Sequence, residues 1–201
     1  MARAAEIALA EGLEIITLRR IADDLGVRPG LVGHYFPVAE DLTAEAFGVA
    51  ATAELESLLP GEGDGDPTGR LVRFLSLTGG DTFDGMSRLW LNARHLSRYR
   101  ASLRERVEHQ EEQWSGRLSA LISEGVAAGQ FRCADPWAAA VWILIVLDGL
   151  GTHASTHPRN QPEVVATMTV VTAERELGLA PGTLSTLMTK TWRDQAGTAS
   201  D

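Results

Sequence analysis

The stretch RRIADDLGVRPGLVGHYF, residues 19–36, decides how this sequence is interpreted. Two helices that cross at a steep angle need a small residue where they approach, and a residue in the turn that tolerates a left-handed backbone. Ala22 and Gly26 meet these needs at a spacing of four residues. The apolar residues around them are positioned to form a small shared core: Ile21, Leu25, Val27, Val32, Tyr35 and Phe36. The window predicts a helix-turn-helix, with an ordinary helical hairpin as the alternative.

Helical signals continue on both sides of this window. Thr17 is a favourable N-cap, Gly26 a favourable C-terminal stop, and Pro29 suits a first helical turn. No segment shows a sustained strand pattern. We expect helices at 2–11, 17–25, 28–36, 39–59, 68–79, 82–99, 101–128, 135–154, 162–178 and 183–195. The sequence thus predicts an all-α fold of about nine to ten helices, with a three-helix helix-turn-helix domain at 1–48 and a larger helical bundle at 49–201.

The composition is that of a globular protein with an acidic surface. Net charge is 18 − 27 = −9, so contact with nucleic acid would have to come from a local surface. The most hydrophobic run, Ala138 to Leu147, is ten residues long. Crossing a bilayer takes about 20 apolar residues. We expect this run to be a buried helix, and the protein to be cytoplasmic without a membrane partner.

Chemistry-bearing patterns are sparse. Cys133 is the single cysteine, too few for a thiolate metal site. His153 and His157 have the spacing of a metal pair on a helix, but no third ligand is evident, so a surface pair is the simpler interpretation. There is no set of nucleophile, base and acid, and no glycine-rich phosphate loop. We expect no cofactor, no metal and no enzymatic activity.

The segment from Thr17 to Leu42 resembles the DNA-binding domain of the tetracycline-repressor (TetR) family. The residues that carry the resemblance are Thr17, Arg19, Ile21, Ala22, Leu25, Gly26, Val27, Gly30, Tyr35, Phe36, Glu40 and Leu42. Further along, AAGQFRCADPWAAAVWILIVLDGL, residues 127–150, resembles a TetR C-terminal domain of the betaine-operon-repressor type. The resemblance implies a homodimeric transcriptional regulator, usually a repressor, that binds a palindromic DNA operator and is released by a small-molecule effector.

The resemblance also implies which residues face DNA. Thr17 and Arg19 would contact phosphate, since helix N-termini bind phosphate without net positive charge. Arg20 would face either phosphate or solvent. The face entering the major groove would be Arg28, Pro29, Gly30, Leu31, Gly33, His34 and Tyr35.

Several positions depart from the family pattern. Arg28, Pro29, Leu31, Gly33 and Ala39 stand where relatives commonly have other residues, which are small polar, basic or aromatic. Residues 1–48 hold four Arg against eight Asp and Glu. We therefore expect few phosphate contacts per monomer and a strong dependence on dimerisation. The alternative is a ligand-binding or protein-interaction module with weakened DNA binding.

Two C-terminal helices are candidates for a dimer interface. Small residues in one and a helical apolar stripe in the other would suit a two-fold four-helix bundle, which matches a palindromic operator. The alternative is that both helices belong to the monomer core. The predicted interface residues are Ala139, Val146, Gly149, Val164, Met168 and Val171.

Aromatic residues on separate helices are candidates for an effector pocket. Such a pocket is apolar with a few placed polar groups. For each aromatic residue, ordinary core packing is the competing interpretation. If tryptophans surrounded a cavity near Asp148, a cationic ligand would fit by cation–π attraction. The predicted ligand-binding residues are Phe74, Met86, Trp90, Asn92, His95, Trp114, Trp142 and Asp148.

Overall fold

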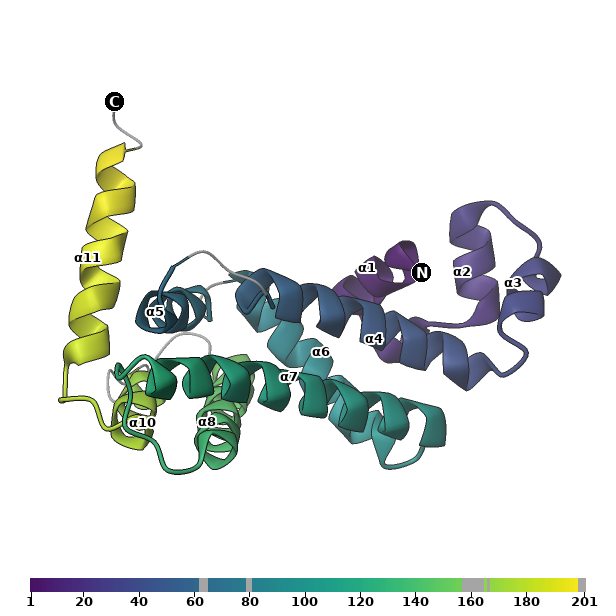
Figure 1. Ribbon diagram of the computed structural model, residues 1–201. Coiled ribbons are helices and arrows are strands. Elements are labelled where there is room, and N and C mark those ends of the chain that lie inside the picture. The colour runs from purple at the N-terminus through teal and green to yellow at the C-terminus, as the bar shows by residue number, and fades with distance from the viewer. Residues whose placement is uncertain (62–64, 79–80, 157–164, 166, 199–201) are drawn as a thin grey trace. The chain divides into compact units, whose positions relative to one another are not determined.

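A computed structural model of the protein describes residues 1–61, 65–78, 81–156, 165 and 167–198. Within these residues every secondary-structure element is a helix and there is no strand (Figure 1). The predicted all-α class is therefore confirmed. The elements are α1 (Ala2–Glu11), η1 (Leu13–Ile15), α2 (Leu18–Leu25), α3 (Pro29–Tyr35), α4 (Ala39–Leu58), α5 (Pro67–Leu77), α6 (Asp81–Ser97), α7 (Ala101–Ala127), α8 (Pro136–Thr156), α10 (Met168–Glu176) and α11 (Thr183–Thr198).

The predicted helices agree closely with these bounds. One difference is η1, a single 3₁₀ turn too short to show periodicity in sequence. Another is the helix predicted at 162–178: of its described residues, 165 and 167–178, those from Met168 to Glu176 form α10, and residues 162–164 and 166 lie outside the described part.

The chain packs as two compact units. Unit 1 comprises residues 1–57 and 84–113, and unit 2 comprises residues 58–83 and 114–201. Unit 1 therefore contains the predicted helix-turn-helix together with most of α6 and the first half of α7. The boundary that the sequence predicts after residue 48 remains a prediction.

The core of unit 1 joins α1, α4, α6 and α7. The Phe47 ring meets Trp90 edge-to-face, with centroids 4.9 Å apart. Each large apolar side chain buried in this way contributes roughly 1.5–3 kcal/mol. The residues at most 2% exposed include Ile7, Leu13, Leu42, Phe47, Leu89, Ala93 and Leu103.

The core of unit 2 joins α5, α7, α8 and α10. Glu174 of α10 is buried, and its carboxylate accepts hydrogen bonds from the backbone N–H groups of Gly182 (2.9 Å) and Leu184 (2.8 Å). These N–H groups lie at the start of α11, where a carboxylate is favourable. Glu174 therefore ties α11 to α10. Buried apolar residues include Leu71, Phe74, Leu118, Leu121, Ile122, Ala139, Ile143, Leu177 and Leu184.

Helix α8 is buried on one face only, so the prediction of a buried helix is wrong for its other face. Trp142 and Ile145 are 55% and 56% exposed. Within the described residues, α8 is the one helix long and apolar enough to cross a membrane, judged by its length and composition. The qualifying window, Pro136–His153, has a mean hydropathy of 1.3 and is 28% buried. The apolar run in the sequence, Ala138 to Leu147, is shorter than this window because it ends at Asp148.

Candidate nucleic-acid interface

The helix-turn-helix is held by local hydrogen bonds that its sequence specifies. Thr17 caps α2, its Oγ1 accepting from the backbone N–H of Arg20 at 3.1 Å. Gly26 ends α2 with φ 66°, a left-handed conformation that favours glycine. The N–H of Val27 then donates to the carbonyl of Ala22 at 2.9 Å. Both predicted caps are confirmed.

The contact between α2 and α3 is small. Ile21, Ala22 and Val32 are at most 7% exposed. Leu25 and Tyr35 are 54% and 72% exposed, so the prediction that they join this core is wrong. Each is the last residue of its helix, beyond the crossing that the buried residues fill.

Most of α3 faces away from the protein. Arg28 precedes the helix as its N-cap, and Pro29 and Gly30 form its exposed first turn. Leu31 is 50% exposed, and the exposed His34 lies edge-on to Tyr35 with ring centroids 5.6 Å apart. Exposed apolar and aromatic residues gathered on one helix indicate a contact surface.

The two glycines of α3 are not required by packing inside the protomer. A Cβ added at Gly30 would meet no atom within 4 Å, and one at Gly33 would meet only Leu18 Cδ1 at 3.8 Å, an ordinary contact. Neither glycine has a positive φ. Gly30 is therefore not needed for packing within the protomer, and its lack of a side chain leaves open space on the exposed face of α3.

The arginines of this region differ in their availability. Arg20 donates to Glu11 at 2.8 Å and to Asp24 at 3.3 Å. The Arg19 side chain is 87% exposed and lies 3.7 Å from Asp23. Arg28 is exposed and has no ion pair with any described residue. Arg19 and Arg28 are therefore the cations of α2 and α3 best placed to meet phosphate.

A further arginine, not singled out in the sequence, fastens α1 to α2. Arg3 donates to Asp24 through Nε at 2.6 Å and through a second nitrogen at 3.0 Å. The Arg3 hydrogen bond holds the pKa of the Asp24 carboxyl below its ordinary value, with Arg20 adding to the effect, and Asp24 raises the pKa of Arg3 in turn. The ion pairs of Asp24 leave Arg3 and Arg20 with little free charge for DNA.

Four predicted ligand-binding residues fall in unit 1. Met86 is buried. Trp90 is occupied by protein groups: besides Phe47, its Nε1 donates to Glu54 at 2.9 Å and the Arg94 guanidinium lies 4.8 Å from its ring. Asn92 bonds to Leu13 and Glu14, and His95 is exposed. This arrangement favours the core-packing interpretation for Trp90.

The other four fall in unit 2. Phe74 is fully buried, and its ring centroid lies 6.3 Å from that of Trp114. Trp114 is 7% exposed, and its Nε1 has no hydrogen-bond partner among the described residues. Trp142 and Asp148 are exposed on α8. Trp142 thus differs from Phe74 and Trp114 in burial: it is 55% exposed, whereas they are buried.

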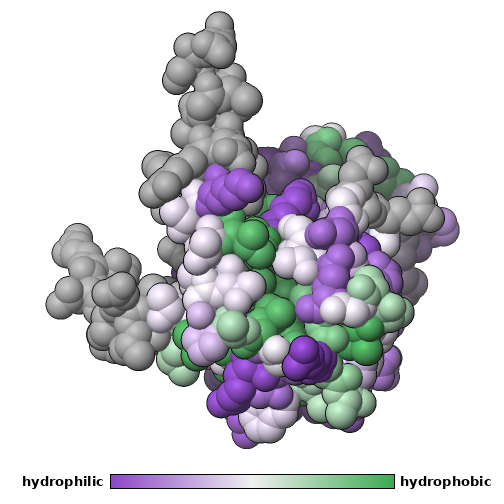
Figure 2. Space-filling model, turned by 60° about the vertical axis from the view of Figure 1, so that its left-hand side comes forward, coloured by the Kyte–Doolittle hydropathy of each residue, from purple (hydrophilic) through white to green (hydrophobic). Residues whose placement is uncertain are grey.

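The predicted dimer-interface residues also differ from one another in exposure. Ala139 is 2% exposed and packs inside unit 2, whereas Val146 is half-buried and Gly149 exposed. Met168 and Val171 on α10 are 44% and 57% exposed. Val164 lies outside the described residues. Figure 2, which brings the α10 and α11 side of the molecule forward, shows hydrophobic residues in a band between hydrophilic ones.

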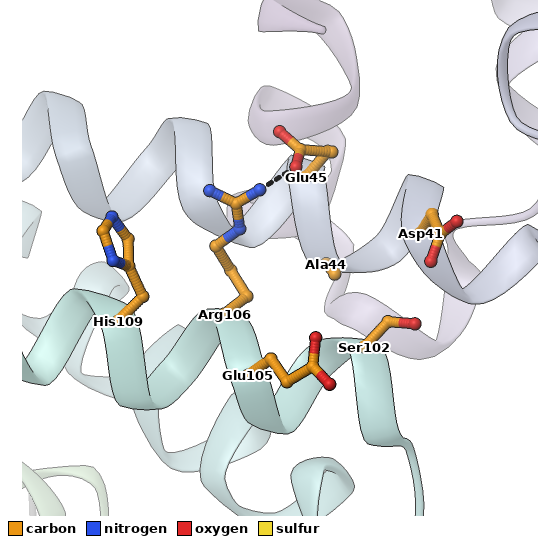
Figure 3. Close-up of a pocket in the computed structure, with 7 residues that line it drawn as sticks. All are labelled: Asp41, Ala44, Glu45, Ser102, Glu105, Arg106 and His109. Carbon is orange, nitrogen blue, oxygen red and sulfur yellow. Dashed lines mark hydrogen bonds and ion pairs between the residues drawn. The ribbon is translucent and has the colours of Figure 1, made fainter.

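Unit 1 also contains a polar groove between the first turns of α4 and α7 (Figure 3). Its volume is about 390 Å³. Arg106 points across it and forms an ion pair with Glu45. The lining residues are Asp41, Ala44, Glu45, Ser102, Glu105, Arg106 and His109. Among the described residues no group of three or more His, Cys, Asp or Glu could hold a metal ion, and His157 of the predicted pair lies outside them.

The comparisons with known proteins agree with this geometry. The family model of the BetI-type transcriptional repressor, C-terminal, matches residues 67–177, more than half of the chain. Comparison with curated proteins finds no significant match.

Solved structures of similar fold include a TetR transcription regulator from Haloarcula marismortui (24% identity, 88% of this chain and 94% of that one, TM-score 0.69). A transcriptional regulator from Saccharomonospora viridis in complex with choline is similar at 21% identity (83% and 89%, TM-score 0.65). The regulator FadR from Bacillus subtilis in complex with stearoyl-CoA is similar at 18% identity (87% and 94%, TM-score 0.63). The chain therefore belongs to the TetR family of transcriptional regulators, with a C-terminal domain of the BetI type.

Proposed function

We propose that this protein is a homodimeric repressor that binds a palindromic operator and is released by a small-molecule effector bound in its C-terminal helices. The observation that carries the proposal is the exposed face of α3 and its N-cap, where Arg28, Leu31 and Tyr35 are all exposed in the described protomer. It is a regulator and not an enzyme, and its site of action is the cytoplasm, where its DNA lies.

DNA recognition would use α3 in the major groove. Arg28, at the start of the helix, would reach a guanine edge, and a bidentate contact of this kind contributes about 1–3 kcal/mol of discrimination. Thr17 and Arg19, at the start of α2, would position the motif on the phosphate backbone. Pro29, Gly30, Gly33 and His34 would complete the surface next to the bases.

Dimerisation would use the exposed apolar face shared by α8 and α10. Trp142, Ile145, Met168 and Val171 are each at least 44% exposed in the protomer. Pairing of this face with its two-fold copy would remove it from water, and the symmetry would match two operator half-sites. An intermolecular contact also accounts for the hydropathy of α8 without a membrane. Ala139 is not part of this interface because it is buried already.

The effector would bind in unit 2 beside Phe74 and Trp114. The unpaired indole N–H of Trp114 favours an effector with a hydrogen-bond acceptor next to an apolar or aromatic-contacting part. Choline, which the Saccharomonospora viridis regulator binds, is one molecule to test, since a quaternary ammonium packs well on aromatic faces. Stearoyl-CoA, the ligand of the Bacillus subtilis regulator, represents the larger apolar class.

The test is footprinting of the purified protein on the DNA flanking its own gene. We expect a palindromic protected site at moderate salt. Arg28→Ala should weaken operator binding at least about tenfold, the equivalent of one specific base contact, and leave the dimer intact. Arg132→Ala, which changes an exposed arginine of unit 2 outside α8 and α10, is the matched control. Sequence-independent binding alone, or no footprint, would contradict the proposal.

A further inference from the structure

The turn between α6 and α7 is the most basic part of this acidic chain. Residues 94–104 contain four Arg, one His and no Asp or Glu. At the turn itself stand Arg98, Tyr99 and Arg100, which we name the basic tip. Tyr99 is 75% exposed, and the His95 ring packs edge-on against it with centroids 6.0 Å apart. The basic tip thus presents an aromatic side chain between two cations.

The side chains of the neighbouring arginines have structural partners, whereas within the described residues those of Arg98 and Arg100 have no acidic partner. Arg94 donates to Glu111 at 2.9 Å and covers the Trp90 ring. Arg104 donates to the carbonyls of Ser97 (3.2 Å) and Arg98 (3.3 Å), which satisfies groups left open at the end of α6. The side chains of Arg98 and Arg100 form no ion pair with any acid in the described parts of the chain. Their charge remains available.

The basic tip lies at the end of unit 1 that carries the helix-turn-helix. Helix α4 begins four residues after α3 ends, and its first turn lines the same groove as the first turns of α7 (Figure 3). Asp41 and Ser102 mark the two sides of that groove. In Figure 1 the α6–α7 turn and the start of α4 occupy the same side of unit 1.

We propose that the basic tip binds backbone phosphates of the duplex that α3 reads, as a second DNA contact on each protomer. This inference rests on the proposed function. Residues 1–48 carry four Arg against eight acids, and Arg3 and Arg20 are paired with carboxylates. Arg28 has no ion pair within the described residues, and Arg19 meets Asp23 only at 3.7 Å with both side chains well exposed, so these two arginines supply most of the positive charge that the helix-turn-helix leaves for DNA. Arg98 and Arg100 add two further positive charges and so double the charge available to DNA.

The chemistry of the basic tip suits a phosphate backbone better than base edges. Two guanidinium groups and a phenol hydroxyl are all hydrogen-bond donors, and the phosphate diester oxygens are acceptors. Helix α7 starts here, and its first N–H groups add partial positive charge. The groove behind carries Asp41 and Glu105, whose charge confines the contact to the outermost residues.

The test compares two variants that each remove two positive charges. Arg98→Gln with Arg100→Gln removes those of the basic tip. Arg88→Gln with Arg132→Gln removes two from exposed residues elsewhere. Operator affinity is measured against salt concentration for both, and for a third variant, Arg98→Lys with Arg100→Lys, that retains the charge. Melting curves establish that each variant is folded.

If the basic tip binds phosphates, it contributes to the dependence of operator affinity on salt concentration. Each phosphate contact contributes about 0.9 to the slope of log affinity against log salt, so four lost contacts in a dimer lower it by about 3 to 4. We expect this decrease, with at least about tenfold weaker binding, in the glutamine variant of the basic tip alone. Equal slopes in this variant and the Arg88 and Arg132 control would overturn the inference.

The two proposals fail in different ways. If the wild-type protein leaves no footprint, the proposed function is wrong, and the same variants are then compared on random-sequence duplex at low salt. Phosphate contacts do not depend on sequence, so weaker binding by the glutamine variant of the basic tip there supports the inference. Equal binding of the random-sequence duplex by the glutamine variant of the basic tip and by the Arg88 and Arg132 control would also overturn the inference.

Discussion

Asn92 of α6 accepts a hydrogen bond through Oδ1 from the backbone N–H of Leu13, at 2.8 Å, although 79 residues separate the two in sequence. Its Nδ2 donates in turn to Glu14 Oε1 at 2.8 Å. Leu13 is fully buried, and the turn that it starts, η1, leads directly to Thr17 at the N-terminus of α2. Asn92 therefore holds the segment that positions the helix-turn-helix.

We predict that Asn92→Ala destabilises the protein and weakens DNA binding together. Loss of Oδ1 leaves the buried N–H of Leu13 without a partner, which costs about 1–3 kcal/mol. Denaturant unfolding and operator affinity are the measurements. Glu14→Gln, which keeps an acceptor for Asn92 Nδ2, serves as the control and should change both quantities little. An Asn92→Ala protein with wild-type stability would show that the hydrogen bond contributes nothing.

A second prediction concerns Gly30 on the exposed face of α3. Alanine at this position meets open space and favours helix, so Gly30→Ala should leave stability unchanged or raise it by up to about 1 kcal/mol. Operator affinity should nevertheless fall, because the added methyl group lies on the surface proposed to approach DNA. Calorimetry and a binding titration separate the two effects. Unchanged affinity would mean that Gly30 does not lie against DNA.

A third prediction uses two glycines of the same helix, α7. A Cβ at Gly125 would overlap the ring of Phe131, which is 3% exposed, whereas a Cβ at Gly116 would meet nothing within 4 Å. Gly125→Ala should destabilise by about 1–3 kcal/mol through overpacking. Gly116→Ala should stabilise by up to about 1 kcal/mol. Thermal unfolding of both variants checks the prediction, and the same sign for both would contradict it.

A fourth prediction follows from the ion pairs of Asp24. The pKa of Asp24 is lowered in the folded protein, chiefly by the hydrogen bond from Arg3, so folding favours the ionised carboxyl. This stabilisation is complete well above the ordinary value of 3.8 and is lost as pH falls below it. Asp24→Asn should therefore be less stable at neutral pH, with the difference closing in acid. A difference independent of pH, measured by denaturant unfolding, would exclude the ion pairs as its cause.

Local structure could be predicted because its causes are local. Thr17, Gly26 and Pro29 act on the backbone next to them, so the caps of α2 and the start of α3 were evident in the sequence. The link between Asn92 and Leu13 was not evident, because helical periodicity indicates which face of a helix is buried but not which distant backbone group a polar side chain will meet. From sequence alone, Asn92 is therefore grouped with the candidate ligand-binding residues.

The same limit applies to Trp142 and Arg20. Hydrophobic content cannot distinguish a residue buried within a protomer from one exposed on an apolar face, so the sequence places Trp142 and Trp114 in the same group. Likewise, the sequence shows the charge of Arg20 but not that Glu11 and Asp24 hold it. Sequence patterns do not determine a site where it depends on which residues the fold brings together.

The last prediction tests the proposed role of the apolar face of α8 and α10. Ile145 is 56% exposed on α8, so Ile145→Glu should leave the protomer folded. In a two-fold interface the variant would place two carboxylates in an apolar contact, and burial of unpaired charge is strongly unfavourable. We expect a monomer by analytical ultracentrifugation and a loss of operator affinity. Leu91→Glu, at a residue 42% exposed on α6, is the matched control and should remain dimeric. An Ile145→Glu protein that stays dimeric at micromolar concentration would show that α8 does not form the dimer interface.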